Sequence, residues 1–147
     1  MKIRRATIKD LDGLIEVTKY SGYPLPQYIL TPERLKQYFN MKSFVFVAVE
    51  NNEIIGYATF MHEFRDGCEL HSIEVKKNFH RKGVGAALLK RVEKETKKMG
   101  KNKLYLIVYQ KNFIAISFYS KHAYYISELI QGHYSGGECA LLMLKDI

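Results

Sequence analysis

Residues 73–89, Ile-Glu-Val-Lys-Lys-Asn-Phe-His-Arg-Lys-Gly-Val-Gly-Ala-Ala-Leu-Leu, decide the fold of this chain. They predict a strand that ends at Val75, a basic loop, a turn at Gly83 and Gly85, and then a helix. Such glycines let the backbone direct its N–H groups at one point, to which the helix adds the positive end of its dipole. The stretch therefore favours phosphate binding. The stretch does not match a P-loop, because the Gly-Lys-Ser/Thr ending of that motif is missing. It does not match a dinucleotide-binding fingerprint either, because Leu88 stands where the third glycine is required.

The composition bounds the class of protein. The 147 residues, 47% of them hydrophobic, suit one globular domain spanning 1–147. Two cysteines, Cys68 and Cys139, are too few for a disulfide scaffold and suit free thiols in a reducing compartment. The N-terminus lacks a signal peptide, and no apolar run approaches the roughly 20 residues of a membrane helix. We therefore expect a soluble, cytoplasmic protein without a membrane partner.

The positive charge is concentrated in one segment. The formal net charge is +8, and residues 76–111 hold twelve Lys or Arg against only Glu93 and Glu95. An excess of this kind favours an anionic partner, which by charge alone is a nucleic acid, a membrane or a phosphorylated small molecule. A nucleic-acid-binding module therefore stays open as an alternative, although lysines mixed with glutamates on one helix more often form a solvated face.

Hydrophobic periodicity and turn residues place the remaining elements around this stretch. Strands are expected at 3–7, 44–49, 54–60, 68–75, 104–109, 124–130 and 140–144, and helices at 11–18, 32–39, 84–99 and 113–122. Asn51-Asn52 and Asp66-Gly67 predict hairpin turns, so the strands from 44 to 75 form an antiparallel meander. A meander followed by strand, helix and strand predicts a mixed α/β sheet covered by helices.

Two motifs resemble those of a known family. His80-Arg-Lys-Gly83-Val-Gly85 resembles the Gln/Arg-x-x-Gly-x-Gly/Ala signature of the GNAT superfamily of N-acetyltransferases, with His80 in place of Gln or Arg. Asn112-x-x-Ala115-x-x-Phe118-Tyr119 resembles the family's second motif, with Ala123-Tyr124 in place of its Gly-Phe. The resemblance spans essentially the whole chain. It implies a single α/β (α+β) GNAT domain whose mixed, mostly antiparallel sheet is splayed between the fourth and fifth strands.

The resemblance also implies acetyl-CoA as co-substrate, with no metal. It places the pantetheine arm beside Ile73 and Val75, with a hydrogen bond from Asn112, and the Val75 N–H on the thioester oxygen. Either Arg81 or Lys82 would meet the ribose phosphate. The pyrophosphate would lie on the backbone N–H groups of Arg81, Lys82, Gly83, Val84, Gly85 and Ala86.

Transfer to an amine requires a base for the amine and an acid for the leaving thiolate. The resemblance makes Tyr119 the acid. Period-two geometry places on one face of the fourth strand Glu69, His71, Ile73 and Val75. Either Glu69 or His71 is then the base, directly or through water. No covalent intermediate is needed, so neither cysteine has to be a nucleophile, and Cys68-x-x-His71 without a second ligand pair predicts no metal site.

The acceptor is a primary amine of two possible kinds. Residues 132–143 resemble the ending of members that acetylate protein N-termini, which favours a protein or peptide α-amino group. Those members carry Glu or His where this chain has Ile107, so a small amine such as a polyamine or amino-acid derivative is the alternative. We expect the aromatic residues of 20–28 and Tyr134 to flank the acceptor. The oligomeric state is not indicated.

Overall fold

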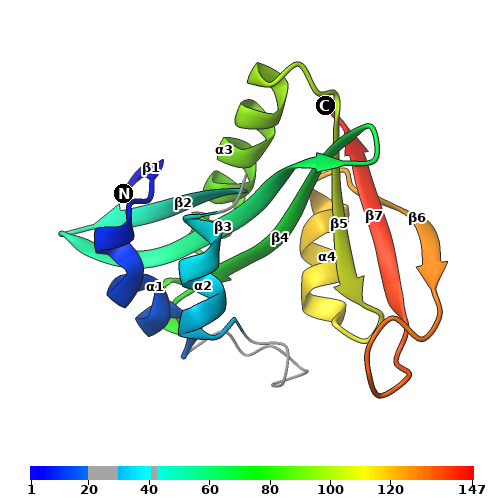
Figure 1. Ribbon diagram of the computed structural model, residues 1–147, viewed down its shortest axis with the longest axis horizontal. Helices are drawn as coiled ribbons and strands as arrows, with labels where there is room; N and C mark the ends of the chain where they lie inside the picture. Colours follow the sequence, from blue (N-terminus) through cyan, green and yellow to red (C-terminus); the bar gives the residue numbers. More distant parts are fainter. Residues whose placement is uncertain (20–29, 41–42) are drawn as a thin grey trace.

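A seven-stranded sheet forms the centre of the computed structural model, which describes residues 1–19, 30–40 and 43–147 (Figure 1). The strand order is β1-β2-β3-β4-β5-β7-β6, and every neighbouring pair is antiparallel except β4 and β5. The strands are β1 (Lys2–Arg5), β2 (Ser43–Glu50), β3 (Glu53–Phe64), β4 (Gly67–Val75), β5 (Lys103–Tyr109), β6 (Tyr125–Ile130) and β7 (Ala140–Asp146).

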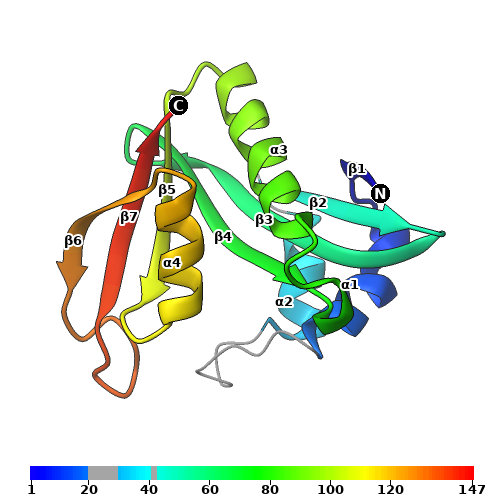
Figure 2. The same ribbon diagram turned by 180° about the vertical axis from the view of Figure 1, so that it is seen from behind.

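Helices cover both faces of this sheet. One face carries α1 and α2, and the opposite face carries α3 and α4 (Figures 1 and 2). The helices are α1 (Leu11–Thr18), α2 (Pro32–Tyr38), α3 (Val84–Lys98) and α4 (Phe113–Lys121), with short 3-10 turns η1 (Ile8–Asp10) and η3 (Lys77–Phe79). The predicted mixed α/β architecture is confirmed. Among the described residues, no helix has the length and apolar character needed to cross a membrane.

The turn residues act as their chemistry predicts. Asn51 and Asn52 take positive φ angles of 49° and 62°, which close the β2–β3 hairpin. Thr31 caps α2 by accepting a hydrogen bond from the Arg34 N–H at 3.3 Å, directly before Pro32. Gly100 ends α3 with a φ of 73°.

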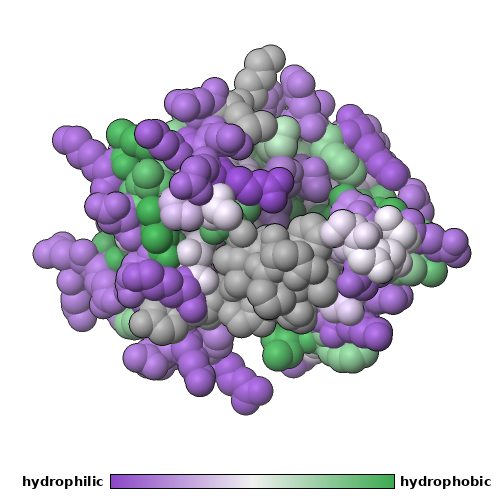
Figure 3. Space-filling model, turned by 60° about the horizontal axis from the view of Figure 1, so that its bottom comes forward, coloured by the Kyte–Doolittle hydropathy of each residue, from purple (hydrophilic) through white to green (hydrophobic). Residues whose placement is uncertain are grey.

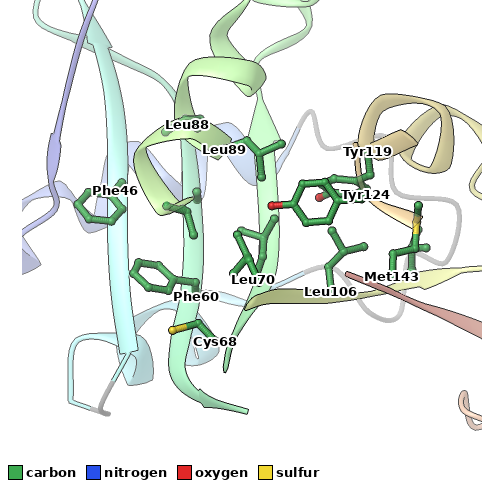
Figure 4. Packing of buried hydrophobic residues seen from close by; sticks show 14 of the residues in the cluster. Phe46, Phe60, Cys68, Leu70, Leu88, Leu89, Leu106, Tyr119, Tyr124 and Met143 are labelled. Carbon is green, nitrogen blue, oxygen red and sulfur yellow. The ribbon is translucent and has the colours of Figure 1, made fainter. Parts of the chain in front are cut away.

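Each face of the sheet has its own hydrophobic core. The core on the side of α1 and α2 joins buried side chains of these helices to those of β2 and β3. Its members are Leu14, Val17, Leu35, Val45, Val47 and Tyr57. The larger core packs α3 and α4 against the opposite face, and Figure 4 shows Leu88 and Leu89 of α3 over Leu70 and Phe60 of the sheet. This two-sided burial fixes which face each sheet residue occupies.

The sheet opens between β4 and β5. Their parallel pairing covers Cys68–Leu70 on β4 and Leu104–Leu106 on β5. Beyond it the two strands diverge toward their C-terminal ends (Figures 1 and 2). The splayed sheet that the family resemblance implied is therefore confirmed.

Candidate active site

A β-bulge lies in β4 where the strand leaves β5. Phe60 of β3 pairs with Leu70 and Thr59 pairs with Ser72, so His71 has no partner opposite it. A bulge inserts one extra residue and thereby reverses the alternation of side chains beyond it. The two halves of β4 therefore present their odd-numbered residues to opposite faces of the sheet.

This bulge corrects one prediction from the sequence. Glu69 and His71 were expected to share a face with Ile73 and Val75, but Ile73 and Val75 pack against the α3 core. His71 instead contacts Tyr38 of α2, on the opposite face. Strict period two fails here because the extra residue shifts the register by one. The two base candidates thus face α2, and the residues predicted to line the donor face α3.

The backbone of β4 is open toward the gap beyond Leu70. The Lys76 N–H donates to the Ile55 carbonyl at 2.9 Å, and residues of an antiparallel pair alternate in the direction of their hydrogen bonds. The N–H and C=O groups of Ile73 and Val75 therefore point away from β3, toward the gap. The imidazole Nε2 of His80 lies 2.7 Å from the Val75 carbonyl oxygen and holds the following loop against the strand end.

The glycine turn presents the bare N-terminus of α3. Gly83 is the N-cap residue, with a φ of 80°, and makes no side-chain cap. The first N–H groups of this 15-residue helix are therefore available to an anion. None of the ion pairs in the described part of the chain involves Arg81, Lys82 or Lys90, so these cations have no carboxylate partner among the described residues. Hydrophilic side chains dominate the rim of this end of the molecule (Figure 3).

An open pocket continues from the turn along α3. It encloses about 370 Å³ and is lined by Ala86, Ala87, Lys90, Glu93, His122 and Lys145. The Lys145 ammonium donates to the Glu93 carboxylate at 2.9 Å, and the Tyr124 hydroxyl donates to the same oxygen at 3.1 Å. Sequence reasoning did not find this pocket, because its walls come from α3, α4 and β7.

Helix α4 brings Asn112 and Tyr119 to the α3 side of the gap. The Asn112 side-chain oxygen accepts the Ala115 N–H at 3.2 Å as the helix cap, so its amide NH₂ remains as a donor. Tyr119 is 9% exposed, and its ring packs edge to face on Phe118. It packs in the same way on Tyr124, beside which it lies in Figure 4. Phe118 lies near Gly85, because a Cβ built on that glycine would be 3.5 Å from its ring. The turn and α4 therefore meet at Phe118.

Polar side chains gather on the α2 side of β4. The Tyr38 hydroxyl lies 2.7 Å from Nδ1 of His71, and Nε2 of His71 lies 3.2 Å from the Glu69 carboxylate. The Glu69 and His71 side chains are 16% and 25% exposed. The structure thus joins both base candidates in one hydrogen-bonded group. Sequence reasoning missed Tyr38, because nothing local to α2 indicates that it meets β4.

Glu74 is a second acidic group that sequence reasoning missed. It pairs with Tyr57, whose ring lies in the core beneath α1 and α2, so Glu74 faces the same side as Glu69. Burial raises the pKa of its carboxyl to about 7. The bulge explains the omission, because without it position 74 lies on the face away from Glu69.

Other residues that the sequence singled out have the following surroundings. Ile107 packs among apolar neighbours with Ile130, so it supplies no base on β5. Tyr134 is buried against Tyr109 at a centroid distance of 5.7 Å, and residues 20–28 lie outside the described part of the chain. Burial raises the pKa of the Cys68 thiol, which keeps it a poor nucleophile. In the described ranges, no three His, Cys, Asp or Glu residues are placed to hold a metal ion.

Comparison with known proteins agrees with this geometry. The model of the acetyltransferase (GNAT) family matches residues 10–124. An N-alpha-acetyltransferase of Saccharolobus solfataricus is 29% identical over 99% of this chain and 92% of its own length. A spermidine N(1)-acetyltransferase of Thermoplasma acidophilum is 26% identical over 87% of this chain and 90% of its own.

One solved structure with the same fold was determined with coenzyme A bound. PaiA N-acetyltransferase from Thermoplasma acidophilum, in complex with coenzyme A, superimposes with a TM-score of 0.82 at 25% identity. The match covers 99% of this chain and 98% of that one. The family match over most of the chain, the splayed sheet and the uncapped glycine turn lead to one conclusion. This chain belongs to the GNAT family of acetyltransferases.

Proposed function

We propose that the protein transfers the acetyl group of acetyl-CoA directly to a primary amine, with a protein or peptide N-terminal α-amino group as the first choice of acceptor. The observation that carries this proposal is the division of β4 by its bulge. Glu69 faces α2, while the open backbone at Ile73 and Val75 lines the gap beside α3. Donor and amine would then approach the reacting carbonyl from opposite faces of the sheet, and direct transfer requires that both be held next to each other there.

The residues around the turn suit the phosphates of acetyl-CoA. The N–H groups from Arg81 to Ala86 would hold the pyrophosphate, and Arg81 or Lys82 would meet the ribose phosphate. The pantetheine amides would pair with the open edge of β4 as an added strand does. Asn112 would donate its NH₂ group to the same arm.

The reaction would need three groups from the chain. Glu69 would take a proton from the ammonium form of the acceptor, which frees the nitrogen lone pair to attack the thioester carbonyl. An N–H group of β4 that faces the gap, that of Val75 or that of Ile73, which is nearer to Glu69, would donate to the carbonyl oxygen as negative charge develops there. The C–N bond forms, the C–S bond breaks, and Tyr119 would protonate the leaving thiolate.

Two observations bear on the acceptor. The relative of Saccharolobus solfataricus is named for α-amino acetylation, and residues 132–143 resemble members with that activity. A spermidine acetyltransferase is also among the relatives, which supports a small cationic amine as the second candidate. Since Ile107 supplies no base, either acceptor would depend on the carboxylate of β4.

A thiol-release assay tests this proposal. Purified protein and acetyl-CoA are mixed with a panel of N-terminal peptides, polyamines, amino acids and aminoglycosides. We expect release of free CoA with peptides that carry a free α-amino group, and none with the same peptides acetylated beforehand. Turnover of a small amine with no peptide active would replace the first acceptor by the second. No turnover with any amine would contradict the proposal.

A further inference from the structure

Three side chains form a continuous hydrogen-bonded line from α2 to β4. The Tyr38 hydroxyl lies 2.7 Å from Nδ1 of His71, and the opposite ring nitrogen lies 3.2 Å from Oε2 of Glu69. The rings of Tyr38 and His71 also meet edge to face, with centroids 5.6 Å apart. The imidazole is therefore held at both nitrogens and along one edge.

The chemistry of the three groups fixes where the protons lie. Burial raises the pKa of the Tyr38 phenol. The Thr59 hydroxyl and the Arg34 charge oppose this effect without reversing it, so the phenol keeps its proton at neutral pH. An ionised Glu69 only accepts hydrogen bonds, so Nε2 of His71 must donate to it. In a neutral imidazole Nδ1 is then an acceptor, and the Tyr38 O–H donates to it.

This arrangement separates the roles of Glu69 and His71. The Nε2 of His71 already bears a proton, and its Nδ1 lone pair already accepts one from Tyr38. Neither nitrogen is then available to take a proton from an amine. Of these three groups, only the Glu69 carboxylate retains unused acceptor positions, because His71 donates to just one of its two oxygens.

We propose that Tyr38 is a positioning residue, which fixes His71 in the Nε2–H form and through it orients the Glu69 carboxylate toward the acceptor amine. The inference rests on the proposed function, in which Glu69 is the base. It assigns to α2 a part in the reaction that neither the family match nor the relatives' names give. The acceptor side of the site then includes a side chain from outside the sheet.

A double-mutant cycle tests this role. Tyr38→Phe removes the hydroxyl and keeps the ring, and we expect kcat to fall roughly five- to tenfold, with the KM for acetyl-CoA unchanged. In a His71→Ala background the same substitution is expected to have no further effect, because the connection to Glu69 is already lost. Tyr125→Phe, which removes an exposed hydroxyl near Asp146, is the matched control with wild-type kcat. Equal losses in both backgrounds, or no loss in either, would overturn the proposal.

The proton positions in the unsubstituted protein give a second readout. Long-range ¹H–¹⁵N NMR spectra of the imidazoles distinguish the two neutral forms. We expect the Nε2–H form for His71, and a mixture of forms in the Tyr38→Phe variant. A proton on Nδ1 of His71 in the unsubstituted protein would refute the assignment. This spectrum needs no turnover, so a failure of the acetyltransferase proposal in the amine panel remains distinguishable from a failure of this one.

Discussion

At the scale of single residues, two neighbouring tyrosines have different surroundings and different expected roles. Tyr119 packs its ring on Phe118 and Tyr124 beside the gap, whereas the Tyr124 hydroxyl donates to Glu93 of α3. Figure 4 shows the two rings side by side next to Leu106. Removing one oxygen from each residue therefore tests the proposed acid at Tyr119 and the hydrogen bond to α3 at Tyr124.

We predict that Tyr119→Phe lowers kcat at least tenfold, because the leaving thiolate loses its acid. Tyr124→Phe should instead lower the free energy of unfolding by about 1 kcal/mol through the lost hydrogen bond and leave kcat nearly unchanged. Steady-state kinetics and thermal denaturation of the two variants measure both effects. Wild-type turnover in Tyr119→Phe would remove this residue from the mechanism.

At the scale of elements, the glycine turn combines a structural requirement with a binding role. Gly83 and Gly100 flank α3 with φ angles of 80° and 73°, and a Cβ at either position would meet no atom within 4 Å. An alanine at either position therefore costs backbone strain alone, which is about 1 kcal/mol. The two sites differ in that only Gly83 lies where we place the phosphates.

We predict that Gly83→Ala raises the dissociation constant of acetyl-CoA several-fold, because strain turns the N–H groups of the loop away from a common point. Gly100→Ala should lose similar stability with no change in this constant. Titration calorimetry with acetyl-CoA, together with denaturant unfolding, compares the pair. Equal affinities for acetyl-CoA in both variants would contradict a phosphate site at the turn.

Turns and helix ends could be predicted from the sequence, whereas the bulge in β4 could not. Asn51, Asn52, Pro32 and Gly100 mark their turns and helix ends by local backbone chemistry, and the element bounds beside them were predicted to within one residue. The strand expected to end at residue 60 instead continues as β3 to Phe64, and the 3-10 turns η1 and η3 were not predicted. The bulge at His71 carries no such mark. Its residue types fit either face, and the extra residue becomes visible only in the pairing with Thr59 and Phe60 of β3.

Only the part of the candidate site that lies in local sequence motifs could be predicted from the sequence. The glycine turn and Asn112 lie in motifs of fixed spacing, so their positions followed from the sequence. Tyr38 and the pocket beside Lys90 depend on contacts between distant segments, which one sequence does not reveal. The same shift of register at the bulge caused two errors. Glu69 was placed on the face of Ile73 and Val75, and Glu74 was missed.

At the scale of the whole molecule, the sheet separates two electrostatic environments. The cations without carboxylate partners at Arg81, Lys82 and Lys90 lie on the α3 side, around the turn. Acidic side chains at Glu69 and Glu74 face the α1 and α2 side. We expect an anionic donor and a cationic amine to be drawn to opposite faces and to meet at the gap between β4 and β5. The central claim is that Glu69 takes the amine proton across this gap.

The single-turnover rate of acetyl transfer in a Glu69→Gln variant tests this claim most directly. With acetyl-CoA bound and the amine identified by the panel, we predict a fall of at least about a hundredfold at pH 7. The dissociation constant of acetyl-CoA should stay within about twofold, because Glu69 faces away from the donor and the substitution removes no contact with it. Glu128→Gln, which removes an exposed partner of Arg65 on β6, is the matched control with a wild-type rate. A wild-type rate in Glu69→Gln would contradict the account.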